Sequence, residues 1–250
     1  MPQEQSFAAF TEDLEIKQMH ELGEVLVTKS LLYHLADGEQ SLGTGFGDGR
    51  QRLMMGEDPR LPAMPDKPTL MDFFKLRFAP AQQHLLQSAN LAQRNGEDEK
   101  IVLACLLHDI AVAGFIRSDH GYWGAQLIEP YVDEEVSWAV RAHQSMRFFP
   151  DESVGYEYPQ AYVAMFGKDY ELEPYIVAEY ERSRVHKWYM TARKICVNDL
   201  YSFDPGVVIE IEQFEDLIGR HFKQPSEGLG NDNTPSSHMW RTLRRPCNAL

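Results

Sequence analysis

The apolar run IVLACLL at residues 101–107 constrains the fold of this chain more than any other feature. It follows the acidic stretch GEDEK, and acidic side chains in the first turn stabilise a helix. The sequence therefore predicts a helix over Glu97–Val112. Because the apolar run leaves almost no polar face, this helix needs neighbours on nearly all sides, as at the centre of a bundle.

Helical periodicity predicts those neighbours. The expected helices are Gln82–Arg94, Asp119–Glu129, Asp133–Arg147 and a long helix from about Pro174 to Tyr201. Asn95-Gly96 ends the first of them, and Pro130 stops the second. The best strand signal is VVIEI at 207–211, and strand signals are otherwise few, so the predicted fold class is all-α.

Composition divides the chain into three parts. Residues 1–69 are expected to form an N-terminal helical extension over 1–36 and then a Gly/Pro-rich loop over 37–69, which is long enough to be a lid. Residues 70–223 carry the helical bundle. Residues 224–250 are polar, and terminal segments of this kind are usually flexible tails. The alternative is a segment that docks through Trp240 and its arginines.

Charge and composition exclude several classes of function. The 24 Lys and Arg against 38 Asp and Glu give a net charge of −14, which argues against nucleic acid as the main partner. The chain has no apolar run long enough to span a membrane, and its start lacks the pattern of a secretory signal. Three cysteines form neither a disulfide framework nor a metal knuckle. We expect a cytoplasmic protein that acts on a small molecule.

The dipeptide His108-Asp109 follows the buried run directly. Adjacent helical residues point about 100° apart, so they do not chelate one ion as an i,i+4 pair does. A carboxylate there can bridge two ions while the imidazole binds one of them, and such ligands suit divalent iron, manganese or zinc. On the dipeptide alone, a helix end capped by water or backbone is the favoured interpretation, because His-Asp pairs are common by chance.

Longer stretches resemble the HD-domain superfamily of metalloproteins. The segment QQHLLQSANLAQRNGEDEKIVLACLLHDI is similar to the opening of these proteins, and the fuller pattern is H…HD…H…H…D. The segments HGYWGAQLIEPYV, VSWAVRAHQSMRFF and CVNDLYSFDP resemble the subset of HD-domain oxygenases that includes 2-amino-1-hydroxyethylphosphonate dioxygenase and, more distantly, myo-inositol oxygenase. The resemblance covers about residues 70–205 and implies an all-α HD bundle.

The resemblance also implies a site and an activity. It implies two irons in an Fe(II)/Fe(III) pair, with dioxygen as co-substrate and C–H abstraction from a small hydroxylated, anionic substrate. The implied metal ligands are His84, His108, Asp109, His120, His143 and Asp199. Asp109 would bridge the irons, and Arg147, one turn after His143, would be a catalytic residue that grips the anionic group. Arg193 is a further candidate for substrate binding.

Two other functions stay open at this point. The first is a dinuclear HD phosphohydrolase that acts on a nucleotide or phosphate ester, because it would use the same ligands. The second is a non-catalytic protein that keeps its metal for stability. The sequence also departs from the phosphonate enzymes, because Val112, Phe74 and Arg77 stand where these carry His, Tyr and Glu. The resemblance therefore does not extend to the same phosphonate substrate.

Overall fold

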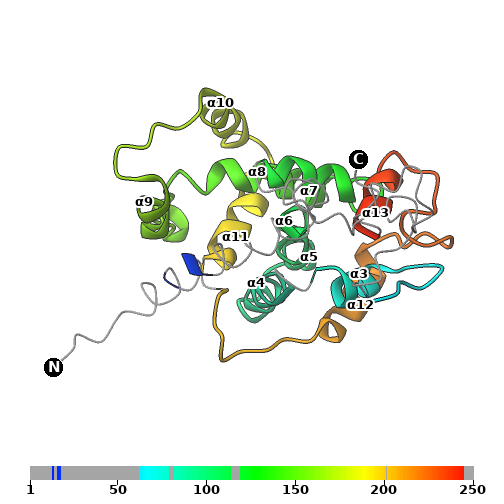
Figure 1. Cartoon of the computed structure of the whole chain (residues 1–250). Helices are drawn as coiled ribbons and strands as arrows, with labels where there is room; N and C mark the ends of the chain where they lie inside the picture. The colour runs from blue at the N-terminus through cyan, green and yellow to red at the C-terminus, as the bar shows by residue number, and fades with distance from the viewer. Residues whose placement is uncertain are drawn as a thin grey trace, which may run out of the picture.

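The computed structural model of the chain describes residues 62–78, 82–113, 119–200 and 202–244, together with Asp13, Ile16 and Lys17. Over these residues the architecture is helical (Figure 1). The β pairing that the described residues contain is a single isolated bridge, between Asp151 and Tyr156. The predicted all-α class is confirmed, and the 207–211 segment is not a strand.

The helices follow one another with short connections. The α-helices are α3 (Leu70–Leu76), α4 (Gln82–Arg94), α5 (Glu99–Leu107), α6 (Ile110–Ala113), α7 (His120–Ile128), α8 (Glu134–Met146), α9 (Gln160–Phe166), α10 (Pro174–Ser183), α11 (Tyr189–Asp199), α12 (Glu215–His221) and α13 (Ser237–Arg244). Two 3-10 helices, η2 (Glu152–Val154) and η3 (Ile211–Phe214), lie between them. None of the helices in the described part is long and apolar enough to cross a membrane.

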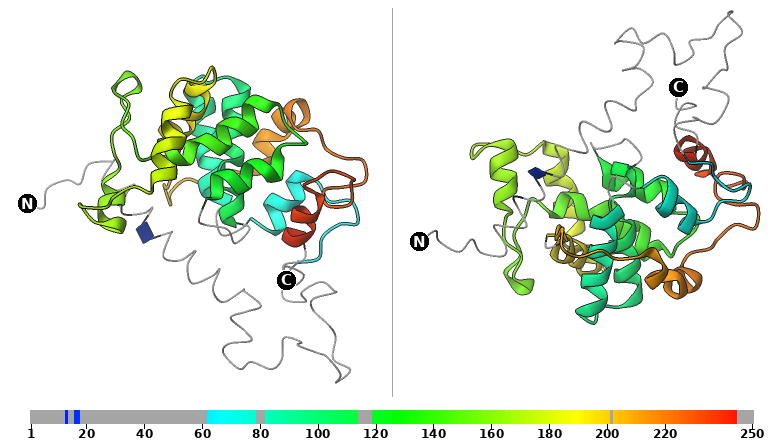
Figure 2. Two further views of the ribbon diagram at one scale, coloured as in Figure 1. Left: turned by 90° about the horizontal axis from the view of Figure 1, so that it is seen from above. Right: turned by 60° about the horizontal axis from the view of Figure 1, so that its bottom comes forward.

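Helix α5 lies at the centre of the bundle, as its apolar run predicts. It packs against α4, α8, α11 and α12, and its residues Val102 to Leu107 are all buried. Figure 2 shows α4, α5, α8 and α11 side by side from two further directions. Helices α4, α8 and α11 therefore pack around α5 in a common core.

The predicted helix over Glu97–Val112 is wrong at both ends. Asp98 caps α5 by accepting a hydrogen bond from the Lys100 N–H, so the helix begins at Glu99. It ends at Leu107, and the chain turns at His108 and Asp109 before α6. In this turn the His108 ring donates from Nδ1 to the Cys105 carbonyl at 2.7 Å. From this turn, His108 contacts Asp199 of α11 and Asp109 contacts His120 of α7.

The predicted helix from about Pro174 to Tyr201 is two helices, and residues 184–188 form turns between them. The His186 ring stacks on Trp138 of α8 with centroids 4.0 Å apart. This tertiary contact holds the connection in a non-helical path. As a result, α10 and α11 are separate elements, and Figure 1 shows α10 at the edge of the molecule.

The expectation of a flexible tail is wrong for the C-terminal residues that the structure describes. Helix α13 docks on the bundle through Trp240, which is fully buried and donates from Nε1 to the Leu127 carbonyl at 3.0 Å. Its ring meets Phe73 edge-on at 4.7 Å. The Arg244 guanidinium donates from Nη2 to the Pro65 carbonyl at 3.0 Å. The alternative, docking through Trp240 and arginines, is therefore confirmed.

The remaining domain predictions lie largely outside the described residues. The helical extension over 1–36 is described only at Asp13, Ile16 and Lys17, and the loop over 37–69 only from residue 62 onward. The boundaries at 69/70 and 223/224 stay predictions.

Candidate metal centre

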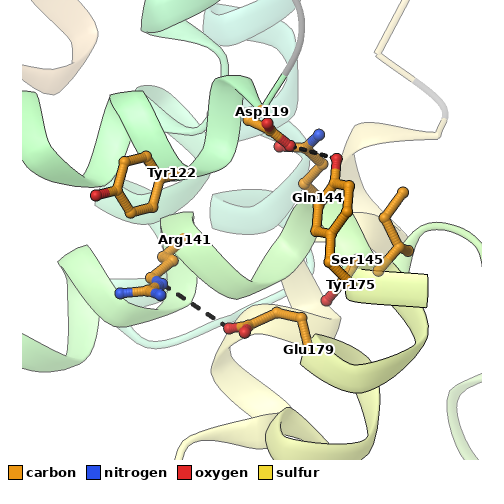
Figure 3. Close-up of a pocket in the computed structure, with 8 residues that line it drawn as sticks. Asp119, Tyr122, Arg141, Gln144, Ser145, Tyr175 and Glu179 are labelled. Carbon is orange, nitrogen blue, oxygen red and sulfur yellow. Dashed lines mark hydrogen bonds and ion pairs between the residues drawn. The ribbon is translucent and has the colours of Figure 1, made fainter. Parts of the chain in front are cut away.

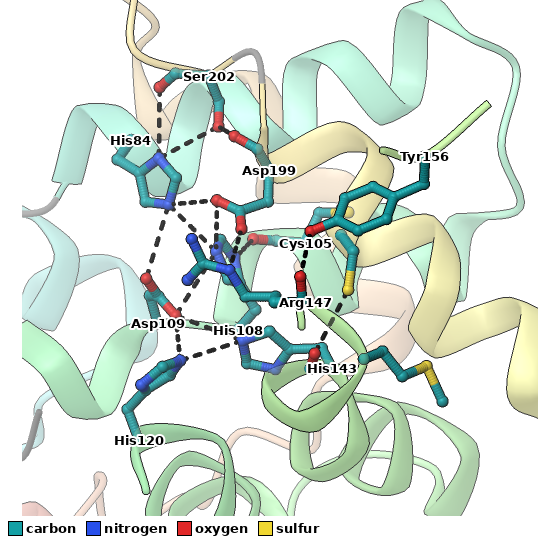
Figure 4. A network of polar contacts seen from close by, with 12 residues as sticks. His84, Cys105, His108, Asp109, His120, His143, Arg147, Tyr156, Asp199 and Ser202 are labelled. Atoms are coloured by element: carbon teal, nitrogen blue, oxygen red, sulfur yellow. Dashed lines mark hydrogen bonds and ion pairs between the residues drawn. The ribbon is translucent and has the colours of Figure 1, made fainter. Parts of the chain in front are cut away.

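The structure brings all six predicted metal ligands to one place (Figure 4). They come from five elements: His84 from α4, His108 and Asp109 from the turn after α5, His120 from the start of α7, His143 from the last turn of α8, and Asp199 from the end of α11. His108 and His143 are fully buried, and His84 and Asp199 are almost so. An interior cluster of ionisable groups is costly unless each has a partner of opposite charge.

One half of the cluster is formed by His84, His108 and Asp199. His84 Nε2 lies 2.9 Å from Asp199 Oδ1 and 3.1 Å from His108 Nε2. His108 Nε2 lies 3.4 Å from the same Asp199 oxygen. Three ligand atoms within this distance of one another can hold a metal ion.

The other half is formed by His120 and His143 around Asp109. His120 Nε2 lies 3.2 Å from Asp109 Oδ1, and His143 Nε2 lies 3.5 Å from the same oxygen. The second oxygen of Asp109 faces the first half, with Oδ2 3.7 Å from His84 Nε2. Asp109 Oδ1 also lies 3.6 Å from His108 Nε2, so the Asp109 carboxylate stands between the two halves and contacts histidines of both.

The hydrogen bonds of His84, His108 and His143 use the Nδ1 atoms and turn the Nε2 atoms toward the cluster. His108 donates from Nδ1 to the Cys105 carbonyl, and His143 donates from Nδ1 to the Val140 carbonyl at 2.5 Å. His84 places Nδ1 against the carbonyl and hydroxyl of Ser202. With the proton on Nδ1, the Nε2 lone pairs face one another, and only a positive charge between them removes the repulsion.

Two carboxylate oxygens of the cluster are buried without a hydrogen-bond partner, Asp109 Oδ1 and Asp199 Oδ1. Buried polar atoms rarely lack a partner, and an unplaced ion is one explanation. Both oxygens face the Nε2 atoms across the cluster. The nitrogen and oxygen donors of the cluster therefore suit a divalent cation.

The pKa values of the cluster residues are shifted by burial and by their charged neighbours. Burial opposes the charged form of His84, but the neighbouring carboxylates of Asp109 and Asp199 raise its pKa to about 10. Burial lowers the pKa of His143 to about 4, assisted by repulsion from the neighbouring histidines. Burial would raise the pKa of Asp109 and of Asp199, but the surrounding histidines, together with Arg147 at Asp199, hold both pKa values well below the usual range.

Comparison with known families identifies the fold that carries this cluster. A family model of the HD domain matches residues 82–173. The chain carries an HD domain. Such domains are generally metal-dependent enzymes, within a superfamily of hydrolases and oxygenases. No curated protein matches the chain.

The HD domain match accounts for most of the cluster but not all of it. It includes His84, the His108-Asp109 pair, His120 and His143. Asp199 lies beyond the matched residues, on α11. The sixth predicted ligand is therefore placed in the cluster by the fold of the chain after the matched segment.

Arg147 of the HD domain points into the cluster (Figure 4). Its Nε lies 3.3 Å from Asp199 Oδ2, and its guanidinium stacks over the Tyr162 ring at 5.0 Å. The Tyr156 hydroxyl donates to the Arg147 carbonyl at 3.0 Å. The sequence expectation that Arg147 faces the same cavity as His143 agrees with this placement.

Arg193 lies elsewhere. It is fully buried and donates from Nη1 to the carbonyls of Met146 and Phe149, at 3.0 Å each. Its Nε donates to the Tyr189 hydroxyl at 3.1 Å. These bonds join α11 to the end of α8. We therefore assign Arg193 to this connection and not to substrate binding.

Sequence reasoning missed the residues that orient the cluster. Ser202 fixes His84, Phe203 stacks on the His84 ring at 4.2 Å, and Tyr156 and Tyr162 hold Arg147. Ser202 and Phe203 belong to the SFDP run three and four residues after Asp199, which is the only one of these signals visible in the sequence.

Proposed function

We propose that the HD domain of this chain binds two iron ions and uses dioxygen to oxidise or cleave a small hydroxylated, anionic substrate. The observation that carries the proposal is the close approach of four imidazole Nε2 atoms to the carboxylates of Asp109 and Asp199. Imidazole and carboxylate ligands suit iron, and an interior site limits access of water.

The two groups assign the ligands. His84, His108 and Asp199 would hold one ion, and His120 and His143 the other, with Asp109 shared. Bound irons would supply the one-electron chemistry that reactions with dioxygen require. The carbonyls of Cys105 and Val140 fix the ring orientation of His108 and His143, because each accepts the Nδ1 proton.

Arg147 would orient the substrate. Its guanidinium is close to the cluster and is held by the Asp199 carboxylate and the Tyr162 ring. A planar guanidinium binds carboxylate, phosphonate or phosphate oxygens in a fixed geometry. In an acidic protein, Arg147 and the metal ions would provide the local positive charge that an anionic substrate needs.

The alternative is a dinuclear phosphohydrolase. One observation supports it, because Arg147 beside the cluster would bind a phosphate ester as well as it binds another anion. The same six ligands would also suit zinc or manganese. One observation argues against it. Cleavage of a phosphate ester benefits from several positive charges at the site, and Arg147 is the cationic side chain that the described contacts place at the cluster.

The deciding experiment is to purify the full chain without added metal, count the metals, and record EPR spectra after partial oxidation. About two irons per chain and a mixed-valent signal would support the oxygenase. Zinc or manganese instead, with anaerobic turnover of p-nitrophenyl phosphate, would establish the hydrolase. The His238→Ala variant is the control for metal counting, because His238 is an exposed histidine of α13 that lies outside the cluster.

A further inference from the structure

The ligand His120 begins α7 in an unusual way. Asp119, the residue before it, has φ +53° and ψ +34° and is the sole non-glycine residue of the described chain with a positive φ. This left-handed conformation is unfavourable for most L-residues and is tolerated best by glycine, asparagine and aspartate. The Asp119 side chain also makes no capping hydrogen bond to α7. Other contacts must therefore hold the start of this helix.

Two neighbouring helices provide those contacts. The Gly121 N–H of the first turn donates to Oε1 of Gln144 on α8 at 3.0 Å. The Tyr175 hydroxyl, from the first turn of α10, donates to Oδ1 of Asp119 at 2.6 Å (Figure 3). The hydrogen bond to Asp119, together with burial, raises the pKa of Tyr175 to about 12.

We propose that Asp119 and Tyr175 form a latch that positions His120 for metal binding. Asp119 is adjacent to His120 in the chain, so the carboxylate held by Tyr175 fixes the backbone from which the His120 ring projects. The ring in turn lies 3.2 Å from the shared Asp109 oxygen. This inference rests on the proposed two-metal site and adds two positioning residues to it.

The contact between Asp119 and Tyr175 lies at the edge of a cavity, so it can be removed without disturbing the core. A cavity of about 290 Å³ lies between α7, α8 and α10, and both partners line it together with Tyr122, Arg141, Gln144 and Glu179. The Tyr175 side chain is 52% exposed, so removing its hydroxyl leaves no hole in the core. A loss of metal binding on this change would therefore report on His120 and not on general packing.

The chain offers a matched set of variants. Tyr175→Phe removes the donor, and Tyr180→Phe is its control, because Tyr180 lies on the same helix and no hydrogen bond of its hydroxyl is found among the described residues. Asp119→Asn keeps an acceptor and tolerates the left-handed backbone. Asp119→Gly relieves the backbone but removes the acceptor, and Asp119→Ala loses both.

The readout is metal binding by the full chain, with Co²⁺ as the probe. Titration followed by visible absorption should give two sites in the wild type. We expect Tyr175→Phe, Asp119→Gly and Asp119→Ala to weaken one site about tenfold and to change its spectrum, because residues that orient a ligand affect affinity to this extent. Asp119→Asn and Tyr180→Phe should bind as the wild type does.

Each other outcome has a defined meaning. A wild-type chain that binds fewer than two Co²⁺ ions would contradict the proposed two-metal site itself. Two normal sites in Tyr175→Phe, or in Asp119→Gly, would overturn the latch. Equal weakening of both sites with a lowered melting temperature would also overturn it, because the residues would then act on the whole fold.

Discussion

The Nε2 atoms of His84 and His108 lie 3.1 Å apart, although the Nδ1 atom of each ring already faces an acceptor. Two neutral rings in this arrangement direct lone pairs at one another. The carboxylate of Asp199, 2.9 Å from His84, adds negative charge to the same point. A bound cation relieves this repulsion, and without it a proton must take its place.

Metal removal should therefore destabilise the protein. Binding to the folded state alone stabilises it by roughly 2.7 kcal/mol when the free metal is at 100 times its dissociation constant. We expect EDTA treatment followed by buffer exchange to lower the melting temperature in differential scanning calorimetry, and added Fe²⁺ under nitrogen to restore it. An unchanged transition would contradict a structural contribution from the metals.

Replacing the shared carboxylate should affect both ions. The Asp109 carboxylate lies near all four histidines of the cluster, whereas the ion pairs of Asp199 among the described residues are with His84, His108 and Arg147. We expect Asp109→Asn to bind less than one metal per chain and Asp199→Asn to keep about one. Metal counting by mass spectrometry on gel-filtered protein distinguishes them. Full occupancy in Asp109→Asn would refute the bridging role.

The docking of α13 should contribute strongly to stability. Trp240 is fully buried against Phe73, Phe78 and Tyr131. Trp240→Ala should lower the free energy of unfolding by about 3–5 kcal/mol, as for other buried aromatic truncations. Trp123, which is 41% exposed, provides the control, and its replacement by alanine should cost about 0.5 kcal/mol. Urea denaturation measures both, and equal effects would contradict the docking.

Close packing of α7 on α8 should make Gly121 intolerant of a side chain. A Cβ atom there would lie 2.9 Å from the Val140 carbonyl oxygen and 3.0 Å from that of Arg141. We expect Gly121→Ala to destabilise the fold by about 1–3 kcal/mol. Gly219 of α12 has open space at its Cβ position, so Gly219→Ala should instead stabilise by up to about 1 kcal/mol. The same urea experiment tests the opposite signs.

The buried thiols should resist alkylation. Burial raises the pKa of the Cys196 thiol to about 12 and the pKa of the Cys105 thiol further still. Because both folded-state pKa values lie far above pH 8, the reactive thiolate is scarce there. In a Cys247→Ser background, we expect iodoacetamide at pH 8 to label neither thiol until urea unfolds the chain. Rapid labelling of folded protein would contradict this burial.

Sequence reasoning recovered the elements whose signals are local. Helix α4 has the predicted bounds, because Asn95-Gly96 stops it and Gly96 adopts the φ of +72° that favours glycine. The six residues of the cluster were predicted from the resemblance to HD-domain proteins, and the structure brings them together. The break before α11 was missed, because it depends on the His186 ring stacking on Trp138, 48 positions earlier in the numbering.

The conformation of Asp119 and the docking of Trp240 were hidden for a similar reason. Asp119 adopts its left-handed backbone in the presence of a hydroxyl from α10, far along the chain. The polar composition around Trp240 resembles a flexible tail, and its buried position depends on an aromatic pocket made by α3 and Tyr131. Contacts between distant segments leave no local pattern.

The turns at residues 184–188 separate the helix that carries Tyr175 from the helix that carries Asp199. If α10 and α11 formed one continuous helix, any shift of α10 would also move Asp199. With the joint, α10 can acquire substitutions, or change length, without disturbing the ligand at the end of α11. Under the proposed latch, α10 then acts on the cluster through Tyr175 and Asp119, while Asp199 is held separately by α11.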